Sequence, residues 1–163
     1  MTNINRATPT NYQLVIPTIV SDSTPDTMRE LTLNIYGTVI PGVSLDQIDS
    51  RWQGNKMNFH PGGITFDSWN INFMVDADYT NWQYLFNWLT MISNNYDVPS
   101  NTPYKYSVDC TLKIFDNFQT SVMKLSFKNV WIQSLGEVVL SQREGESQVE
   151  CSATFAYDRF EIC

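Results

Sequence analysis

The chain has 163 residues, and its 10 Lys and Arg against 17 Asp and Glu give a formal net charge of −7. A chain of this length predicts one domain that buries about 70% of its unfolded surface, and an aromatic fraction of 13% excludes intrinsic disorder. The acidic balance argues against tight nucleic-acid binding. No run of about 20 apolar residues predicts a membrane span, and the first residues lack the apolar segment of a signal peptide. We therefore expect a soluble chain that is not exported by that route.

Charged residues make up only 17% of the chain, below the value of about 25% found in typical soluble domains. One explanation for this low charged fraction is ordinary variation in the composition of a β-rich protein. The other is that much polar surface is buried against partners, because charges are depleted at the cores of interfaces.

Alternation of apolar and polar residues predicts that most of the chain is β-strand. In chain order, the expected strands cover residues 12–16, 31–39, 52–59, 69–75, 108–114, 123–128 and 149–157. The last one shows the strongest alternation, and 108–114 with 123–128 predicts a hairpin. A single polar face on each strand favours a mainly β fold of two packed antiparallel sheets, a sandwich or barrel.

Apolar residues at the helical spacing i, i+3, i+4, i+7 and i+10 predict one flanking helix of about four turns over residues 78–93. Its apolar positions are Trp82, Leu85, Phe86, Leu89 and Ile92, with Trp88 alongside. Asp78 is the expected N-cap, and Asn94, Asn95 and Pro99 are expected to end the helix. We expect the apolar stripe to cover a sheet.

Residues 40–63 show only weak alternation and are bracketed by Pro-Gly turns at Pro41-Gly42 and Pro61-Gly62. A long arm or extended hairpin fits this segment best. Residues 93–103 are rich in Asn, Ser and Pro, which predicts a surface loop. The chain shows no repeat and no linker, so we expect a single domain over residues 1–163.

The residues give little support to catalysis or metal binding. His60 is the only histidine and precedes a proline in a turn, which favours a structural or solvated role. Cys110, Cys151 and Cys163 form no metal-binding spacing, and reduced, buried thiols are expected. The carboxylate pairs Asp76 with Asp78 and Glu144 with Glu146 are explained by capping and solvation. We expect no enzyme, no metal and no cofactor.

The order and spacing of several segments resemble the tail tube protein family of contractile-tailed bacteriophages. The resemblance covers about residues 31–160, and its most recognisable part is the C-terminal block. The segments are Ile40-Pro41-Gly42, the arm with Lys56 and Phe59, Gly63 to Trp69, Leu135 to Leu140, and Gln148 to Asp158.

This resemblance implies six copies in a ring and rings stacked into a hollow tube that conducts phage DNA. It implies further that the arm contacts the adjacent ring, with candidate residues Val43, Leu45, Gln47, Arg51, Trp52 and Lys56. The implied partners are further copies of the chain, a tail sheath protein and baseplate initiator proteins, in the virion tail after assembly in the host cytoplasm.

A conduit through which DNA slides needs a neutral or acidic wall. Candidate residues for such a wall are polar positions of the strands, namely Asp109, Thr111, Glu150, Ser152 and Thr154. Lys113, Lys124 and Lys128 compete for the same strand faces, so the strands that line the channel stay open here.

Two alternatives share features with this interpretation. The first is a baseplate protein of the same fold that initiates the tube. The second is a small β-sandwich that stacks sugars on Trp52, Trp69, Trp82, Trp88 and Trp131.

Overall fold

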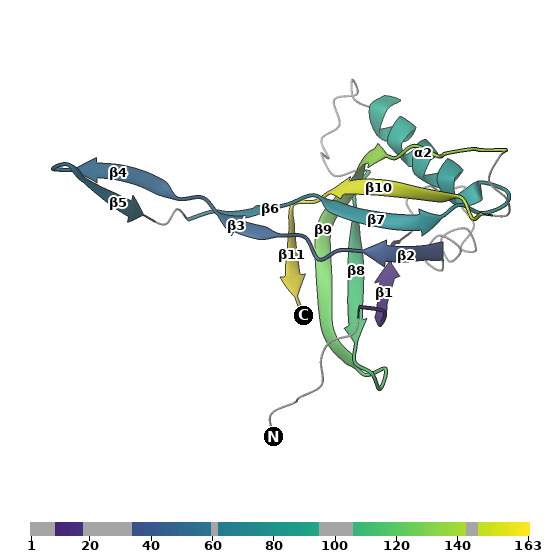
Figure 1. The fold of residues 1–163 in the computed structure, drawn as a ribbon, viewed down its shortest axis with the longest axis horizontal. Coiled ribbons are helices and arrows are strands. Elements are labelled where there is room, and N and C mark those ends of the chain that lie inside the picture. Colours follow the sequence, from purple (N-terminus) through teal and green to yellow (C-terminus); the bar gives the residue numbers. More distant parts are fainter. Residues whose placement is uncertain (1–8, 18–33, 60–61, 95–105, 143–146) are drawn as a thin grey trace.

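The body of the molecule consists of two antiparallel sheets that share their longest strand, β9 (Ser121–Leu135) (Figure 1). The structure is a computed structural model that describes residues 9–17, 34–59, 62–94, 106–142 and 147–163. The first sheet, called the β8 sheet, contains β1 (Tyr12–Val15), β8 (Val108–Phe115), the first half of β9 and β11 (Arg159–Ile162). The second, called the β10 sheet, contains the end of β9, β10 (Glu150–Ala156), β7 (Trp69–Met74) and β2 (Ile35–Thr38).

β9 passes from one sheet to the other at Asn129, which has a φ of 55°. The Asp109 carboxylate supports this corner by accepting the Asn129 backbone N–H at 3.1 Å and the Lys128 ammonium at 2.8 Å. The Asn129 side-chain amide donates to Asp158, where the chain between β10 and β11 follows the same bend. Strands that switch sheets at such bends form the corners of sandwiches whose strands cross at a large angle, and Figure 1 shows this crossing.

The core lies between the two sheets and is dominated by aromatic rings. Trp69 of β7 stacks on Phe127 of β9, with ring centroids 4.3 Å apart and an interplanar angle of 5°. Phe155 of β10 contacts Trp69 and also Trp88 of the helix. All four side chains are fully buried, so these rings join both sheets and the helix into one core.

The helix α2 (Thr80–Asn94) covers the open end of the core. It begins two residues after the predicted N-cap, because Tyr79 precedes it with a φ of 57°. Asn81 takes the anchoring role expected of Asp78: its side-chain oxygen accepts the backbone N–H groups of Trp82 and Asp76, and its amide donates to the Met74 carbonyl. The expectation that Asp78 caps the helix is therefore wrong.

The buried face of α2 consists of Asn81, Tyr84, Leu85 and Trp88. Phe86, which was expected in the apolar stripe, is exposed and stacks on Trp82 at 5.3 Å. The stripe is wider than the surface available beneath the helix, so one edge of it remains outside the core.

The arm consists of two short two-stranded ladders that extend away from the body (Figure 1). The inner ladder pairs β3 (Val43–Leu45) with β6 (Ile64–Phe66), and the outer hairpin pairs β4 (Ile48–Trp52) with β5 (Asn55–Phe59). The prediction of one strand over 52–59 is wrong, because the chain reverses at Gln53-Gly54, where both residues have positive φ. Two central residues of this kind form the tight turn that suits the twist of a hairpin.

The mainly β fold with packed antiparallel sheets, one flanking helix and an extended arm is confirmed. β9 is longer than expected because it serves both sheets, and the apolar residues Val138 to Leu140 form no strand. Cys110 and Cys151 are buried, but Cys163 is exposed, which corrects the expectation for that thiol. The loop predicted over 93–103 begins later than expected, because Ser93 and Asn94 belong to α2. Leu31 and Leu33, the rest of that loop, His60, Glu144 and Glu146 lie outside the described residues.

Candidate assembly surfaces

The outer hairpin of the arm has two chemically different faces. Directly paired residues share a face of a ladder, and the pairs Ile48 with Phe59 and Ser50 with Met57 give one apolar face. The alternate pairs, Asp49 with Asn58 and Arg51 with Lys56, form a polar face on which the Lys56 ammonium lies 3.0 Å from the Asp49 carboxylate. The hairpin therefore has the alternation of a strand pair with one buried face, although no described residue of the body covers its apolar face.

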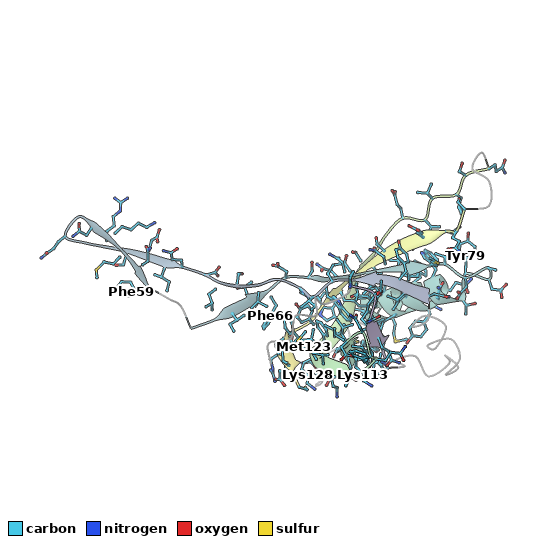
Figure 2. The ribbon with its side chains drawn as sticks, turned by 60° about the horizontal axis from the view of Figure 1, so that its bottom comes forward. Phe59, Phe66, Tyr79, Lys113, Met123 and Lys128 are labelled. Atoms are coloured by element: carbon cyan, nitrogen blue, oxygen red, sulfur yellow. The ribbon has the colours of Figure 1, made fainter. Side chains whose placement is uncertain are left out.

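The inner ladder repeats this arrangement nearer to the body. Val43 pairs with Phe66 and Leu45 with Ile64, whereas Ser44 pairs with Thr65 on the other face. Phe66 packs against Tyr157 and Phe160 of the body, and Figure 2 shows it at the base of the arm with Phe59 far out. The large apolar side chains beyond this base remain about half exposed; they are Val43, Leu45, Ile48, Met57, Phe59 and Ile64.

The candidate arm residues proposed from the sequence fall on different parts of this structure. Val43 and Leu45 share the apolar face of the inner ladder, and Gln47 lies between the ladders. Arg51 and Lys56 oppose each other on the polar face of the outer hairpin, and Trp52 is the last residue of β4. The candidates chosen from the sequence did not include Ile48, Met57, Phe59 and Ile64. The two-residue turn at Gln53-Gly54 places Ile48, Met57 and Phe59 on the apolar face of the outer hairpin. Pairing with Leu45 places Ile64 on the apolar face of the inner ladder.

The β10 sheet has two backbone edges without a strand partner among the described residues. β2 pairs only with β7, and the end of β9 from Trp131 to Leu135 pairs only with β10. Unpaired edges are templates for another strand, and proteins cover or close them. These two edges lie on opposite sides of one four-stranded sheet, so one copy can supply the edge that the next copy lacks.

The outer face of the β10 sheet is mainly polar and carries no basic side chain among the described residues, although Met74, Trp131 and Ala156 also lie on it. Thr154 donates from its hydroxyl to the Asn70 side-chain oxygen at 2.7 Å, and Tyr36 donates to Glu150 at 2.9 Å, which raises the pKa of that phenol. The strand register places these residues together on this face: Tyr36, Asn70, Asn72, Ser134, Glu150, Ser152 and Thr154. Asn70 and Asn72 were not identified from the sequence, although their alternation with Trp69, Ile71 and Phe73 could have indicated them.

The five candidates for the channel wall do not share one face. Glu150, Ser152 and Thr154 lie on the outer face of the β10 sheet, whereas Asp109 and Thr111 lie on the outer face of the β8 sheet, on the other side of the core. Hydrogen bonding to the Lys128 ammonium lowers the pKa of Asp109. One channel wall can therefore include at most one of these two groups.

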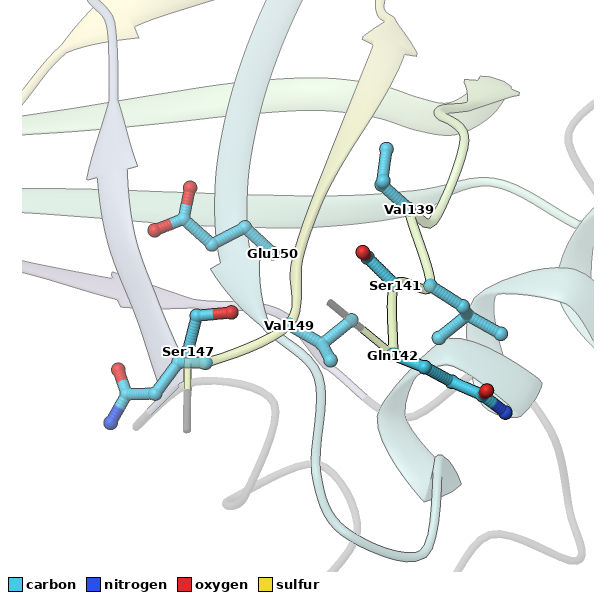
Figure 3. Close-up of a pocket in the computed structure, with 8 residues that line it drawn as sticks. Val139, Ser141, Gln142, Ser147, Val149 and Glu150 are labelled. Carbon is cyan, nitrogen blue, oxygen red and sulfur yellow. The ribbon is translucent and has the colours of Figure 1, made fainter. Parts of the chain in front are cut away.

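One hollow of the described structure holds few ionisable side chains. A hollow of about 820 Å³ beside the β9–β10 connection is lined by Val139 to Gln142 and Ser147 to Glu150 (Figure 3). Glu150 is its single described carboxylate, and no group of three or more potential metal ligands occurs in the part of the chain that the structure describes. Burial raises the pKa of the Cys110 thiol and keeps it protonated, which suppresses its reactivity. Among the described helices, none is long and apolar enough to cross a membrane.

The fold has close counterparts among solved structures of contractile injection systems. A chain of the PVC sheath-tube complex in the extended state aligns with a TM-score of 0.64 and 15% identity, over 97% of this chain and 91% of the other. A chain of the PVC sheath/tube terminator aligns with 0.66 and 15%, over 99% of both chains. A chain of the anti-feeding prophage tube terminating cap aligns with 0.62 and 13%, over 100% and 94%. No curated protein matches this sequence.

These likenesses define the class of the protein: it has the fold of the tubes and tube ends of contractile injection systems. The sequence matches the phage tail tube protein family over residues 7–163, and the chain belongs to that family. It is therefore a structural component of a phage or phage-like tail. Of the five tryptophans named for the sugar-binding alternative, Trp69 and Trp88 are fully buried and cannot belong to an exposed platform.

Proposed function

We propose that the chain acts as one tube domain, of which six copies join edge to edge into a ring and the rings stack into a hollow tube. The observation that carries this proposal is the pair of unpartnered edges on opposite sides of the β10 sheet. In such an assembly β2 of one copy pairs with the end of β9 in the next copy. A head-to-tail contact of this kind forms a closed ring when the rotation from each copy to the next, repeated six times, returns to the first copy. Six copies contribute about 24 strands, more than the 16–18-stranded barrels that already enclose an aqueous channel.

In this ring the outer face of the β10 sheet lines the channel, through which phage DNA passes during ejection into the host. The described part of that face carries amides, hydroxyls and one carboxylate beside the apolar side chains of Met74, Trp131 and Ala156, and it has no lysine or arginine. Each phosphate that a lysine or arginine neutralises adds affinity by releasing counterions. A wall without such side chains lets DNA slide, so we assign Glu150, Ser152 and Thr154 to the wall and place Asp109 and Thr111 outside it.

The arm is the contact between adjacent rings. Its apolar side chains are about half exposed in the single copy, and a neighbouring ring supplies the surface that buries them. Val43 and Leu45 then belong to the buried face, while Arg51 and Lys56 belong to the polar rim of the contact.

A tail sheath and baseplate initiator proteins are the further proposed partners, and assembly takes place in the host cytoplasm before the tube becomes part of the virion tail. The solved chains with this fold come from a sheath-tube complex, a sheath/tube terminator and a baseplate. These origins support partners of the same kinds for this chain.

The test of the ring is a disulfide between copies. A variant with Tyr36→Cys and Ser134→Cys in a Cys163→Ser background places one thiol at each edge of the same sheet face. Because a disulfide needs Cα atoms about 4.4–6.8 Å apart, oxidation of the assembled protein should yield covalent multimers that end at six copies. The control, Tyr36→Cys with Val122→Cys, moves the second thiol to the β8 sheet and should give no covalent multimers. Two results would contradict edge-to-edge closure: covalent multimers in the control alone, or assembled protein that yields covalent multimers in neither variant.

A role at the end of the tube is the second candidate. It is favoured by TM-scores of 0.66 to the tube terminator chain and 0.62 to a baseplate chain, close to the 0.64 of the tube chain. Electron microscopy of the concentrated protein separates the two: a tube protein forms stacks of many rings, whereas a protein of the tube end stops at one or two rings.

A further inference from the structure

The basic side chains of the body are concentrated on one surface. The described residues contain six lysines and arginines, of which Arg51 and Lys56 belong to the arm. The other four lie on the outer face of the β8 sheet: Lys113, Lys124, Lys128 and Arg159. In a chain with a net charge of −7, this face is a local exception.

Ion pairs neutralise one end of this face and leave the other end positive. Near the sheet corner, Lys128 contacts Asp109 at 2.8 Å and Arg159 contacts Glu161 at 2.8 Å. Farther along the strands, Lys113 and Lys124 have no ion-pair partner among the described residues, and the neighbour of Lys113 on β1 is the uncharged Gln13. Figure 2 shows Lys113 and Lys128 together along the lower edge of the body.

The two unpaired lysines stand directly opposite each other in the register of β8 and β9. Directly opposed side chains have Cβ atoms about 5 Å apart, and like charges in this position destabilise a sheet. One carboxylate placed above the pair can contact both ammonium groups. Its negative charge relieves the repulsion between the two lysines, and this relief favours binding.

Apolar side chains border the lysine pair. Val122 alternates with Met123 and therefore shares the outer face with Lys124; it is 69% exposed. Phe118, at the tip of the same hairpin, is 80% exposed, and its loop is held by the Asp116 carboxylate, which accepts the backbone N–H groups of Phe118 and Thr120. An exposed aromatic at the tip of the hairpin that carries the unpaired charges has the composition of a protein-binding surface, where aromatics anchor and charges select the partner.

We propose that this surface, formed by Lys113, Lys124, Val122 and Phe118, docks an acidic segment of the protein that encloses the tube. The inference rests on the proposed function, because it requires the β10 sheet to face the channel and the β8 sheet to face outward. An acidic protein segment fits better than DNA, because the exposed apolar residues beside the lysines offer nothing to a phosphate backbone.

The test measures binding of a fluorescein-labelled oligoglutamate peptide, the probe for an acidic segment, to the full chain and to assembled tubes. Wild type should bind both forms, and binding should weaken as salt increases. The double variant Lys113→Glu with Lys124→Glu should weaken binding by about 2- to 30-fold, because two exposed ion pairs are lost. The variant Lys113→Arg with Lys124→Arg keeps both charges and should bind like wild type.

Several results would overturn the proposal. They are equal binding by the charge-reversed and wild-type chains, no binding of the probe by wild type, or binding to the single chain that disappears in tubes. Tighter binding of duplex DNA than of the peptide to the same face would replace the protein partner by nucleic acid. Microscopy is read separately: failure of the wild-type chain to form tubes contradicts the proposed function, whereas intact wild-type tubes that do not bind the probe contradict only the docking surface.

Discussion

Replacing Ile48, Met57 and Phe59 together by serine should weaken assembly far more than it affects the fold. These side chains form the apolar face of the outer hairpin and are 53%, 46% and 51% exposed. Full burial of such a side chain contributes about 1.5–3 kcal/mol, so burying the exposed half contributes about 0.8–1.5 kcal/mol each. The three changes should cost about 2–4 kcal/mol for each arm that docks. At about 1.4 kcal/mol per factor of ten, the critical concentration for tube formation should rise by roughly 30-fold to several hundred-fold.

Sedimentation of assembled material over a series of protein concentrations measures this critical concentration. The matched control is Asp49→Ser with Lys56→Ser on the polar face of the same hairpin. This pair is more than half exposed on both sides, and such pairs contribute less than about 1 kcal/mol, so the control should shift the critical concentration by less than about fivefold. If the triple variant assembles at the wild-type concentration, the apolar face is not buried between rings and the reasoning fails.

Three further changes test the fold. Thr38→Val leaves the buried Trp69 indole N–H, now bonded to the Thr38 hydroxyl at 2.9 Å, without an acceptor and should cost about 1–3 kcal/mol; an unchanged urea midpoint would contradict this. Lys113→Glu creates an opposite-charge pair with Lys124 and should stabilise the single chain by about 0.2–1 kcal/mol, measured by urea unfolding at low salt; a loss of stability would show that the two lysines do not repel. Asp109→Asn should destabilise the chain by less than about 1 kcal/mol at pH 7, because the carboxylate is half exposed. Since the folded-state pKa of Asp109 lies below 3.8, its contribution is present above about pH 4 and is lost as the pH falls through that lower pKa; a difference from wild type that does not shrink as the pH is lowered from 4 would contradict this account.

The strand pattern of the body was predictable because it depends on local alternation. The inward positions Cys110, Leu112, Leu125 and Phe127 follow from one buried face per strand, and the structure places all four in the core. The helix was predictable for the same reason, since its apolar spacing is local. Its capping was not, because the choice between Asp78 and Asn81 depends on which side chain can reach the end of β7.

The arm shows the limit of local patterns. Its outline follows from weak alternation between two Pro-Gly turns, but its two faces depend on the positive φ values at Gln53 and Gly54. A turn one residue away would exchange the apolar and polar faces, because the side chains of a strand alternate with a period of two.

The sequence by itself determined the membership of the chain in the tail tube family, the mainly β composition and the inward and outward positions of the body strands. Only the tertiary structure decided which outward positions belong together, because alternation assigns a side chain to a face of its own strand but not to a sheet. Asp109 and Glu150 have the same local pattern, yet the bend of β9 at Asn129 sends their strands into different sheets. That bend depends on contacts between residues about 20 and 29 positions apart, Asp109 with Asn129 and Asn129 with Asp158, and no local pattern in the chain contains them.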